Sequence, residues 1–409
     1  MKISLRMTGC KNNRYELDKV ILWAAQNGVE LVTDEGEADF CIINTCTVTH
    51  VADKKSRQLI RKTKNRNKKL KTIVFGCGAR MQKKEFEKID EIDYLLTDLP
   101  AVLDLLEKQK GSLHVSRDEK NTDNIQRSRA LVQIQDGCDN FCTYCITVIA
   151  RGASQNRSVD EIIDEINHHI KNGFNEIVLT GINIGAYGCS KTTKPEESKL
   201  AELLQKILDK TSIKKIRLTS MGPEYFFNDQ LFEILKNPRI CRHIHLAVQS
   251  GSDDVLKKMR RNYTAKQMNT VIKRLKKEIP GIAITSDIIV GFPGETDENF
   301  KETVNFVKRN KLAKVHVFPY SIRKGTAAAE RPQIENTLKK ERSKTLQKIA
   351  DEYRKEFIEG QIGKKISILW EQEVEPGLWE GLTDNYIRIR KKGDYDEKII
   401  TKEIFKKGV

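Results

Sequence analysis

The chain has 409 residues, in which Lys and Arg (73) outnumber Asp and Glu (57), so that the net charge is +16. This length predicts two to four domains. The basic excess favours a polyanionic partner such as nucleic acid, although a solvated lysine-rich surface produces the same excess. No apolar run is long enough for a membrane span, and the amino terminus lacks a signal-peptide pattern. We therefore expect a cytoplasmic protein whose nine cysteines are reduced thiols, free to bind metal, and not a disulfide framework.

The first segment alternates short apolar strands with helices. The expected elements are strands at Ile3–Met7, Phe40–Ile43 and Thr72–Phe75 and helices at 14–26 and 52–62. Asn13 is expected to cap the first helix and Gly28 to end it. This alternation predicts an α/β domain over residues 1–120, with a doubly wound parallel sheet covered by helices.

Three cysteines follow these strands closely. Cys10, Cys46 and Cys77 each come shortly after a strand, and the carboxyl ends of parallel strands share one edge of the sheet, where ligands bind. Three thiols from distant parts of the sequence are thus expected at one edge, where they form a candidate site for an iron–sulfur cluster. The alternative is that they are small buried hydrophobic residues, the usual fate of a free cysteine. Cys41 lies inside a strand and is expected to take that role.

A polar stretch from Asp118 to Arg129 is interpreted as a linker, after which a longer alternation begins. Six strands are predicted, with helices such as 159–171 and 297–309 between them: Leu131–Gln135, Glu176–Thr180, Lys215–Thr219, His243–Val248, Ile282–Ile289 and Lys314–Phe318. The pattern predicts a partial (β/α)6 barrel over residues 125–360, short of the usual eight strands. In such barrels the active site lies at the carboxyl ends of the strands.

The loop after the first barrel strand carries Cys138, Cys142 and Cys145 in the spacing C-x3-C-x2-C. Three such thiolates can hold three irons of a [4Fe–4S] cluster. A fully ligated cluster takes four cysteines, so one iron stays open for a small chelating molecule. Zinc sites usually pair two cysteine knuckles or add histidine, and no histidine lies near. The loop resembles that of the radical S-adenosylmethionine (SAM) enzymes, in which the open iron binds SAM and the cofactor cleaves to a deoxyadenosyl radical.

Residues at neighbouring strand ends are candidates to contact SAM. Gly181 and Asn183 follow the second barrel strand, Gln249 and Ser250 follow the fourth, and Tyr144 precedes the last cluster cysteine. The alternatives are ordinary glycine turns, capping at a strand end and packing of the tyrosine within its loop. Arg151 is a candidate partner for the SAM carboxylate or a phosphate, with a structural ion pair as the alternative.

A helix predicted at 338–359 leads to a segment with a different period. Short alternating strands at Lys365–Trp370, Leu378–Leu382 and Tyr386–Arg390 predict a small C-terminal β-barrel over residues 361–409. So small a domain buries little by itself and is expected to dock on the rest of the chain.

Motifs along the whole chain resemble the radical SAM methylthiotransferase family. They are Thr8–Asn13, Asn44–Thr49, Gly76–Cys77, the cluster loop with Ala150–Gly152, Leu179–Gly188, His245–Leu246, Gln249–Ser252, Asp287–Glu295 and His316–Ser321. The tail resembles the RNA-binding TRAM domain of that family, although it is short. The family commonly has a proline and an aromatic residue after the last cluster cysteine, where this chain has Ile146 and Thr147. The runs Thr47–Thr49 and Asn183–Tyr187 are most similar to the branch that acts on threonylcarbamoyl-adenosine in tRNA.

The resemblance implies SAM and two [4Fe–4S] clusters as cofactors. Cys138, Cys142 and Cys145 would bind the cluster that cleaves SAM, and Cys10, Cys46 and Cys77 an auxiliary cluster whose open iron presents sulfur. The product would carry a methylthio group at C2 of the modified adenosine beside the tRNA anticodon. A flavodoxin or ferredoxin is the expected electron donor, and a monomer is expected. The alternatives are action on isopentenyl-adenosine in tRNA or on an aspartate of a ribosomal protein, and a non-catalytic iron–sulfur RNA-binding protein.

Two basic stretches are candidate phosphate contacts. One lies in a run without acidic residues and the other lies in the tail beside Tyr386; their candidate residues are Lys62, Lys64, Lys68 and Lys69, and Arg388 and Arg390. A solvated helix face is the alternative for the first stretch.

Overall fold

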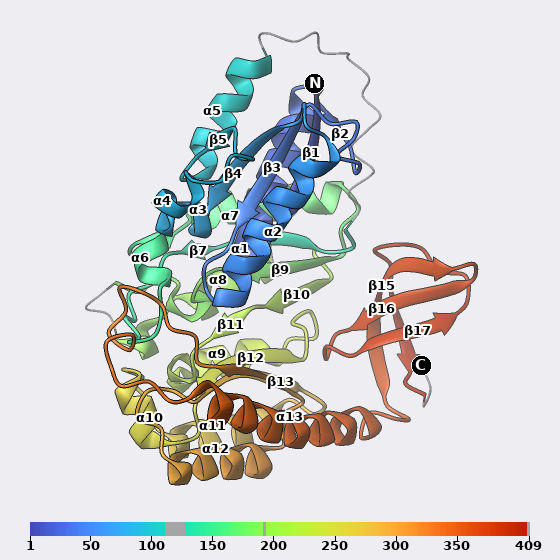
Figure 1. Cartoon of the computed structure of the whole chain (residues 1–409). Helices are drawn as coiled ribbons and strands as arrows, with labels where there is room; N and C mark the ends of the chain where they lie inside the picture. The colour runs from blue at the N-terminus through green and yellow to red at the C-terminus, as the bar shows by residue number, and fades with distance from the viewer. Residues whose placement is uncertain (111–126, 191–193, 407–409) are drawn as a thin grey trace. The chain divides into compact units, whose positions relative to one another are not determined.

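The computed structural model describes residues 1–110, 127–190 and 194–406 (Figure 1). They fall into two compact units. One comprises Met1–Gln126 with Cys145–Gly152 and Ser321–Gly325, and the other comprises Arg127–Tyr144, Ala153–Tyr320 and Thr326–Val409. The predicted linker at Asp118–Arg129 lies mostly outside the described residues. Within the described part of the chain, no helix is long and apolar enough to cross a membrane.

The N-terminal unit is built on a parallel sheet with the strand order β2-β1-β3-β4-β5 (Figure 1). Its strands are β1 (Lys2–Met7), β2 (Glu30–Leu31), β3 (Phe40–Thr45), β4 (Lys71–Gly76) and β5 (Tyr94–Leu95). Its helices are α1 (Lys11–Gln26), α2 (His50–Arg66), α3 (Cys77–Met81), α4 (Lys83–Phe86) and α5 (Leu99–Lys110), with α6 (Thr147–Arg151) added from the later segment.

Alternating side chains cover both faces of this sheet. Ile42 and Phe75 pack with residues of α1 and α5, whereas Ile43 and Val74 pack with residues of α2 and α4. Successive residues of a strand point to opposite faces, so apolar residues throughout β3 and β4 require cover on both sides. The predicted doubly wound sheet is confirmed, and Cys41 is fully buried in its core.

The start of α1 differs from the prediction. The helix begins at Lys11 with Cys10 at the N-cap position, so Asn13 lies within the first turn and is not the cap. Its side chain turns to the neighbouring strand instead, where Nδ2 donates to Asn44 Oδ1 (2.7 Å) and to the Thr45 carbonyl (3.1 Å). The sequence predicted Asn13 as the N-cap, because asparagine is favoured at that position. In the structure, its hydrogen bond to Asn44, which is distant in sequence, takes precedence.

The second unit contains the predicted six parallel barrel strands (Figure 1). They are β6 (Ala130–Gln133), β9 (Glu176–Thr180), β10 (Lys215–Leu218), β12 (His243–Gln249), β13 (Ala283–Val290) and β14 (Lys314–Pro319). Three strands pair in the order β10-β9-β6, and β11 (Ser220–Met221) pairs in the order β11-β12-β13-β14. Thr219 separates β10 from β11, so one stretch of chain pairs first with β9 and then with β12. The strands thus follow one another in a single (β/α)6 arc, as predicted.

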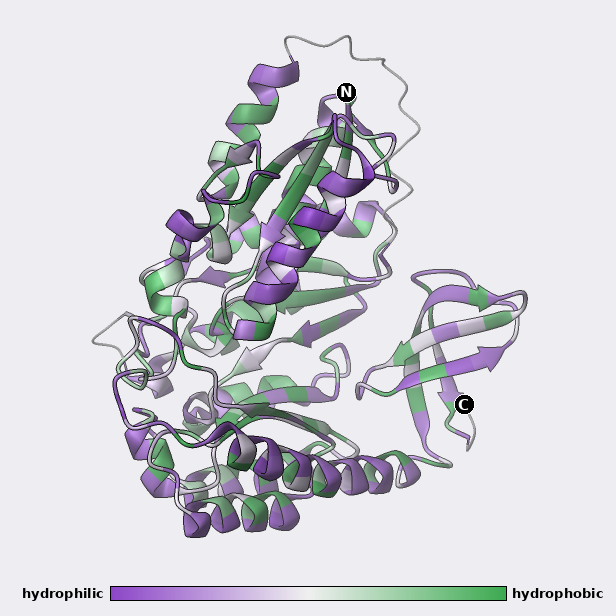
Figure 2. Ribbon diagram, viewed as in Figure 1, coloured by the Kyte–Doolittle hydropathy of each residue, from purple (hydrophilic) through white to green (hydrophobic). Residues whose placement is uncertain are grey.

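Helices separate the barrel strands and cover their outer side. They are α7 (Val159–Lys171), α8 (Leu200–Lys210), α9 (Asp229–Leu235), α10 (Asp253–Lys258), α11 (Ala265–Glu278) and α12 (Asp297–Asn310), with short 3-10 turns η2 (Ile184–Ala186), η3 (Pro195–Glu197) and η4 (Pro223–Phe227). A small ribbon of β7 (Gln135–Asp136) and β8 (Gln155–Asn156) flanks the cluster loop. Figure 2 shows apolar strands inside and mixed helices outside, which is the expected pattern for helices packed on a buried parallel sheet.

The long helix α13 (Asn336–Glu359) leads to a four-stranded antiparallel sheet in the order β17-β16-β15-β18. The strands are β15 (Lys365–Glu375), β16 (Leu378–Thr383), β17 (Arg388–Lys392) and β18 (Ile400–Ile404). The small C-terminal β domain is confirmed, and β18 was not foreseen. The third strand begins at Arg388 instead of Tyr386, because Tyr386 adopts a left-handed φ of +68°.

A buried ion-pair network docks the tail on the barrel within this unit. Arg217 of β10 is fully buried, pairs with Glu176 (2.7 Å) and donates to the carbonyl oxygens of Thr383 (3.0 Å) and Asp384 (3.3 Å). The Asp384 carboxylate also pairs with Arg242 (3.1 Å). Separating the tail from the barrel would leave buried charged groups without these partners, which is costly. The tail is therefore docked on the barrel, as expected for so small a domain.

Candidate functional site

Cys10, Cys46 and Cys77 lie at one edge of the N-terminal sheet. Cys46 directly follows β3, Cys77 directly follows β4 and starts α3, and Cys10 is the N-cap of α1 after β1. In the observed strand order the topological switch point lies between β1 and β3, where ligands of such sheets bind. Cys46 and Cys77 are buried and Cys10 is exposed. The fold therefore brings three thiols distant in sequence to a recognised ligand-binding edge.

Glycines allow the strand-end loops to approach one another. A Cβ on Gly9 (φ +118°) would lie 2.8 Å from Cys46 Cβ, and one on Gly76 (φ +99°) would lie 2.2 Å from Asn44 Oδ1. Both backbone conformations are ones that L-residues rarely adopt. Gly9 precedes Cys10 and Gly76 precedes Cys77, so close approach at each of these cysteines depends on a missing side chain.

A buried polar network supports this edge. Asn44 Nδ2 donates to Glu16 Oε2 (2.6 Å), and the Cys10 thiol donates to Asn13 Oδ1 (3.2 Å). Thr45 Oγ1 donates to the Phe75 carbonyl (2.7 Å) and accepts from Ala79 N (3.0 Å). Asn13, Asn44 and Glu16 were not predicted as site residues. Asn13 and Asn44 do lie within the motifs around Cys10 and Cys46, which is the signal that points to them.

The donor set of this edge fits an iron–sulfur cluster. Burial raises the pKa of the Cys46 thiol and raises that of Cys77 to about 11, while the charge of Arg151 lowers the pKa of both. Ligation therefore has to displace thiol protons. In the described ranges, no three His, Cys, Asp or Glu side chains are placed to hold a single metal ion. A single ion needs all its ligands within about 2.3 Å, whereas a cluster takes one thiolate on each iron.

Arg151 belongs to this N-terminal unit, as does Cys145. Its Nη1 pairs with Glu16 Oε1 (3.0 Å), and its Nη2 donates to Asn13 Oδ1 (3.2 Å). The side chain is 5% exposed. The ion-pair alternative thus describes its contacts, and its charge lies beside the cysteines at the sheet edge.

The cluster loop of the barrel is anchored by Arg261, which was not predicted. Arg261 Nη1 donates to Cys142 Sγ (3.3 Å) and Nε donates to Tyr263 Oη (2.7 Å). The Tyr263 hydroxyl in turn donates to the Ala247 carbonyl of β12 (2.6 Å). Cys145 Sγ accepts from the backbone N–H of Thr147 (3.4 Å). Such N–H···S contacts orient thiolate ligands and tune the clusters they hold.

Gln135 connects the cluster loop to the loop after β9. Its Nε2 donates to the Gly137 carbonyl (2.7 Å), and its Oε1 accepts from the backbone N–H groups of Ile182 (3.1 Å) and Asn183 (3.0 Å). A Cβ on Gly181 would lie 2.9 Å from the Gln135 carbonyl oxygen. Gln135 was predicted at the end of a strand, and its role in joining the two loops was missed. That role follows from the full burial of its polar side chain, which only the structure shows.

The remaining SAM candidates differ in their surroundings. Asn183 Nδ2 donates to Tyr225 Oη (2.9 Å) at the end of β9, and Gln249 has a left-handed φ of +66° at an irregularity of β12. Ser250 is fully buried, and its Oγ accepts from Ser252 N (3.2 Å). Tyr144 packs edge-on against Phe292, with ring centroids 6.4 Å apart. The contacts of Ser250 and Tyr144 are those that their structural alternatives describe.

The basic candidates also fall into two groups. Lys62, Lys68 and Lys69 are exposed, whereas Lys64 Nζ pairs with Asp93 (2.7 Å). In the tail, Arg388 pairs with Glu371 (2.7 Å), and Arg388 and Arg390 share Glu380. The exposed lysines Lys62, Lys68 and Lys69 are therefore better placed to contact a phosphate backbone than Lys64, Arg388 and Arg390, which form ion pairs with acidic side chains.

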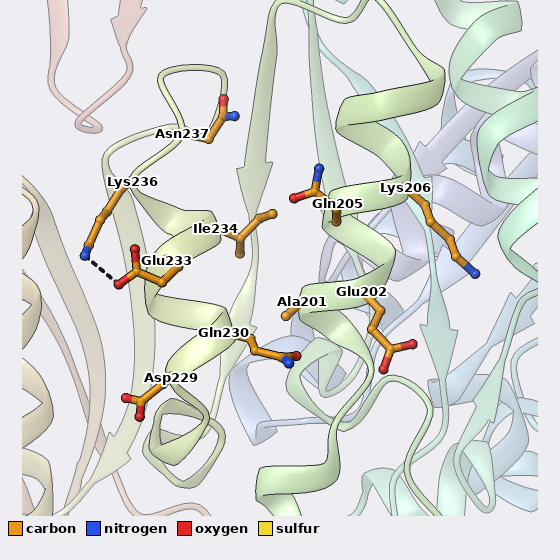
Figure 3. A pocket seen from close by; sticks show the side chains of 10 residues that line it. All are labelled: Ala201, Glu202, Gln205, Lys206, Asp229, Gln230, Glu233, Ile234, Lys236 and Asn237. Carbon is orange, nitrogen blue, oxygen red and sulfur yellow. Dashed lines mark hydrogen bonds and ion pairs between the residues drawn. The ribbon is translucent and has the colours of Figure 1, made fainter.

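A groove of about 870 Å³ lies on the outside of the barrel between α8 and α9 (Figure 3). Its wall includes Glu202, Lys206 and Asp229, and Lys236 pairs with Glu233 across 2.7 Å. None of the predicted cysteines or SAM candidates lines it. This groove is therefore not the site to which the strand ends and motifs point.

Comparison with known proteins identifies the family. Residues 132–307 match the Radical SAM superfamily, and residues 2–97 match the Uncharacterized protein family UPF0004. The chain is 36% identical to the threonylcarbamoyladenosine tRNA methylthiotransferase MtaB of Bacillus subtilis, over 99% of this chain and 94% of that protein. The chain belongs to the radical SAM methylthiotransferase family.

Two other relatives show how far this methylthiotransferase resembles separate branches. It is 34% identical to the MtaB of Thermotoga maritima over 94% of this chain and 90% of that protein. It is 33% identical to a tRNA-2-methylthio-N(6)-dimethylallyladenosine synthase of Clostridium botulinum over 92% of this chain and 85% of that protein. As a radical SAM enzyme, the methylthiotransferase uses SAM and [4Fe–4S] clusters.

Solved structures share the fold at low sequence identity. The radical SAM methyltransferase TsrM of Kitasatospora setae matches with a TM-score of 0.59 and 13% identity over 80% of this chain and 77% of that one. The cobalamin-dependent SAM radical enzyme OxsB matches with a TM-score of 0.52 and 15% identity over 88% of this chain and 56% of that one. At these identities the likeness concerns the fold alone.

Proposed function

We propose that this methylthiotransferase inserts a methylthio group at C2 of N6-threonylcarbamoyladenosine beside the tRNA anticodon. The observation that carries the proposal is the near full-length identity of 34–36% to four proteins named as threonylcarbamoyladenosine tRNA methylthiotransferases. Proteins named for dimethylallyladenosine match at 32–33%. Both names describe tRNA as the substrate, in agreement with the net charge of +16.

The two sets of cysteines take separate tasks in this proposal. Cys138, Cys142 and Cys145 would hold the cluster that, with SAM bound, supplies the radical, and Cys10, Cys46 and Cys77 would hold the auxiliary cluster that supplies sulfur. The chain's own residues prepare both sites. Arg261 orients Cys142 through its N–H···S contact, and the glycines and asparagines at the sheet edge set the spacing of the other three thiols.

Further roles rest on position at the strand ends. Gly181, Asn183 and Gln249 would line the SAM site, because Gly181 and Asn183 lie in the loop after β9 and Gln249 is the last residue of β12. Lys62, Lys68 and Lys69 would contact tRNA phosphates, and residues 361–409 would act as a TRAM-like RNA-binding domain after the domains at 1–120 and 125–360. A flavodoxin or ferredoxin would deliver the electron to a monomeric enzyme in the cytoplasm, where tRNA is modified.

The substrate is tested with anaerobically reconstituted enzyme, dithionite, SAM and three candidate acceptors. These are tRNA bearing threonylcarbamoyl-adenosine, tRNA bearing isopentenyl-adenosine, and a ribosomal protein carrying the candidate aspartate. Mass spectrometry of the products should show methylthiolation of the first acceptor alone. Modification of either other acceptor with none of the first would assign the chain to that alternative. Formation of both clusters without any SAM cleavage would favour the non-catalytic RNA-binding protein.

The phosphate contacts are tested by salt dependence of tRNA binding. Replacing Lys62, Lys68 and Lys69 with glutamine should flatten the plot of log K against log salt, since each lost contact lowers the slope by about 0.7 to 0.9. Lys64→Gln is the matched control, because that lysine is already paired with Asp93. A slope unchanged in the triple variant would return these lysines to the solvated face.

A further inference from the structure

Arg151 follows the cluster loop in sequence, yet its guanidinium contacts residues of the other three-cysteine centre. Nη1 donates to Glu16 Oε1 (3.0 Å) and Nη2 to Asn13 Oδ1 (3.2 Å). The Cys10 thiol donates to the same Asn13 oxygen, also at 3.2 Å. At most twice that distance can therefore separate Arg151 Nη2 from Cys10 Sγ. Because the Arg151 side chain is only 5% exposed, its charge is little screened by water and salt.

The surrounding structure fixes the place of this arginine. Arg151 is the last residue of α6, which packs against α3, the helix that begins with Cys77. Arg80 Nη1 donates to the Ala150 carbonyl (2.6 Å), and Gly152 (φ +79°) turns the chain away directly afterwards. A cation at a helix C-terminus is common on the surface, but here it is buried and directed at Glu16 and Asn13. The field of Arg151 reaches Cys46 and Cys77 as well, since it lowers the pKa of both thiols.

Charge gives this placement a chemical meaning. Three thiolates outweigh the charge of an oxidised [4Fe–4S] core, so a loaded centre at Cys10, Cys46 and Cys77 is anionic. It becomes more so when it is reduced or when it takes up a sulfur anion. Burying negative charge is unfavourable unless a cation lies near. Glu16, the ion-pair partner of Arg151, works in the opposite direction, because its charge raises the pKa of Cys77.

We propose that Arg151 is a positioning residue of the auxiliary centre, whose guanidinium favours uptake of a small sulfur anion such as hydrosulfide and favours the reduced cluster. The inference rests on the proposed function, because it requires Cys10, Cys46 and Cys77 to hold a cluster. It gives the residue after the SAM-cleaving loop a task at the site that supplies sulfur. It assigns Arg151 a partner other than the SAM carboxylate, the one considered from sequence.

The alternative role is purely structural, in which the ion pair with Glu16 only anchors α6. Two variants distinguish the roles, because Arg151→Met and Glu16→Gln break the same ion pair but remove opposite charges. If the pair only anchors the helix, both variants act in the same direction. If the charge acts on the cluster, the two variants shift its reduction potential in opposite directions.

The experiment uses the full-length chain carrying Cys138→Ala, Cys142→Ala and Cys145→Ala, so that only the auxiliary cluster can form. After anaerobic reconstitution, the reduction potential is measured by a redox titration followed by electron paramagnetic resonance, and hydrosulfide affinity by titration with sodium sulfide. Arg151→Met should make reduction and hydrosulfide binding each about tenfold less favourable, which for a one-electron couple is about 59 mV. Glu16→Gln should shift both quantities the other way. Arg151→Lys, which keeps the charge, should lie close to the parent.

Arg80→Met is the matched control, because Arg80 also holds α6 through the Ala150 carbonyl. It should leave the equilibrium constants for cluster reduction and for hydrosulfide binding within about twofold of those of the parent. A shift of Arg151→Met and Glu16→Gln in the same direction, or an Arg151→Met variant that behaves like Arg80→Met, would overturn the inference. If Arg151→Met does not fold, Glu16→Gln and Arg151→Lys still decide it. Failure of the parent to form any cluster would instead overturn the auxiliary centre of the proposed function.

Discussion

The two three-cysteine centres are built in opposite ways. Cys138, Cys142 and Cys145 share one short loop, so their proximity is guaranteed by the chain itself. Cys10, Cys46 and Cys77 come from the ends of three strands, and their proximity depends on the strand order, on two glycines without room for a side chain and on buried asparagines. The first centre should therefore keep its three cysteines together when the fold around it is disturbed, whereas the second should lose their proximity when its sheet edge is disturbed.

Removal of single ligands gives the largest expected effect and separates the two centres. Cys138→Ala should abolish cleavage of SAM to deoxyadenosine, because the reducing cluster loses a ligand. Cys46→Ala should preserve that cleavage and abolish methylthiolation of tRNA. Both products are measured by mass spectrometry after anaerobic turnover. Full methylthiolation by the Cys46→Ala enzyme would remove the auxiliary centre from the mechanism.

Substitution of a glycine should show that the second centre depends on shape. Gly76→Ala places a Cβ 2.2 Å from Asn44 Oδ1 in a left-handed conformation. We expect a loss of about 3 kcal/mol in the free energy of unfolding, and loss of the iron that we propose Cys10, Cys46 and Cys77 bind. Gly173→Ala is the control, because Gly173 has a φ of +80° but no atom within 4 Å of the added carbon. It should cost about 1 kcal/mol and keep all its iron. Equal effects in chemical denaturation would show that crowding at β4 is unimportant.

A milder change tests the support of the loop centre. Arg261→Met removes the N–H···S contact to Cys142 and leaves all three ligands in place. Loss of such supporting contacts typically costs about 10- to 100-fold in activity or metal affinity. We expect that range for the rate of deoxyadenosine formation, together with a lower reduction potential of the cluster. Tyr263→Phe, which keeps the arginine, should have a smaller effect. An Arg261→Met enzyme with normal rate and potential would mean that the loop needs no outside support.

The smallest expected effect is a loss of folding stability at acidic pH, in the sheet that carries Cys10, Cys46 and Cys77. Glu35 is buried, which by itself raises its pKa, but hydrogen bonds from Arg6 and Arg66 outweigh burial and lower the pKa from 4.5 to about 2. A lowered pKa stabilises the fold above pH 4.5 and loses that contribution as the pH falls toward 2. By pH 3.5 the loss is about 1.4 kcal/mol. Apoprotein carrying Glu35→Gln should be less stable than wild type at pH 6 in urea denaturation, with a gap that narrows at pH 3.5. A constant gap would assign the effect to packing.

The sequence was most informative where function depends on spacing along the chain. The cluster loop and the alternation of strands and helices follow from local patterns, and the strand ends placed Cys10, Cys46 and Cys77 at one edge. Contacts between distant residues were not predictable in this way. Asn13 was assigned to a helix cap, although it hydrogen-bonds to Asn44. Gln135 was expected in a strand and lies in β7, but the role of its side chain, which joins two loops, was missed. Such roles depend on register and side-chain direction, which a single sequence does not encode in its periodicity.

The buried ion-pair network around Arg217 also affects how enzymes of this kind can diversify. The carbonyl groups of Thr383 and Asp384 and the carboxylate of Glu176 satisfy this buried guanidinium from both sides. A tail from another protein would have to present the same carbonyl acceptors, or Arg217 would keep its ion pair with Glu176 but have buried N–H groups without an acceptor. The C-terminal β domain is therefore not a portable module. Lys215 Nζ also pairs with the Asp384 carboxylate (3.4 Å). Exchange of tails between relatives should succeed only when Lys215, Arg217 and Arg242 are exchanged with them.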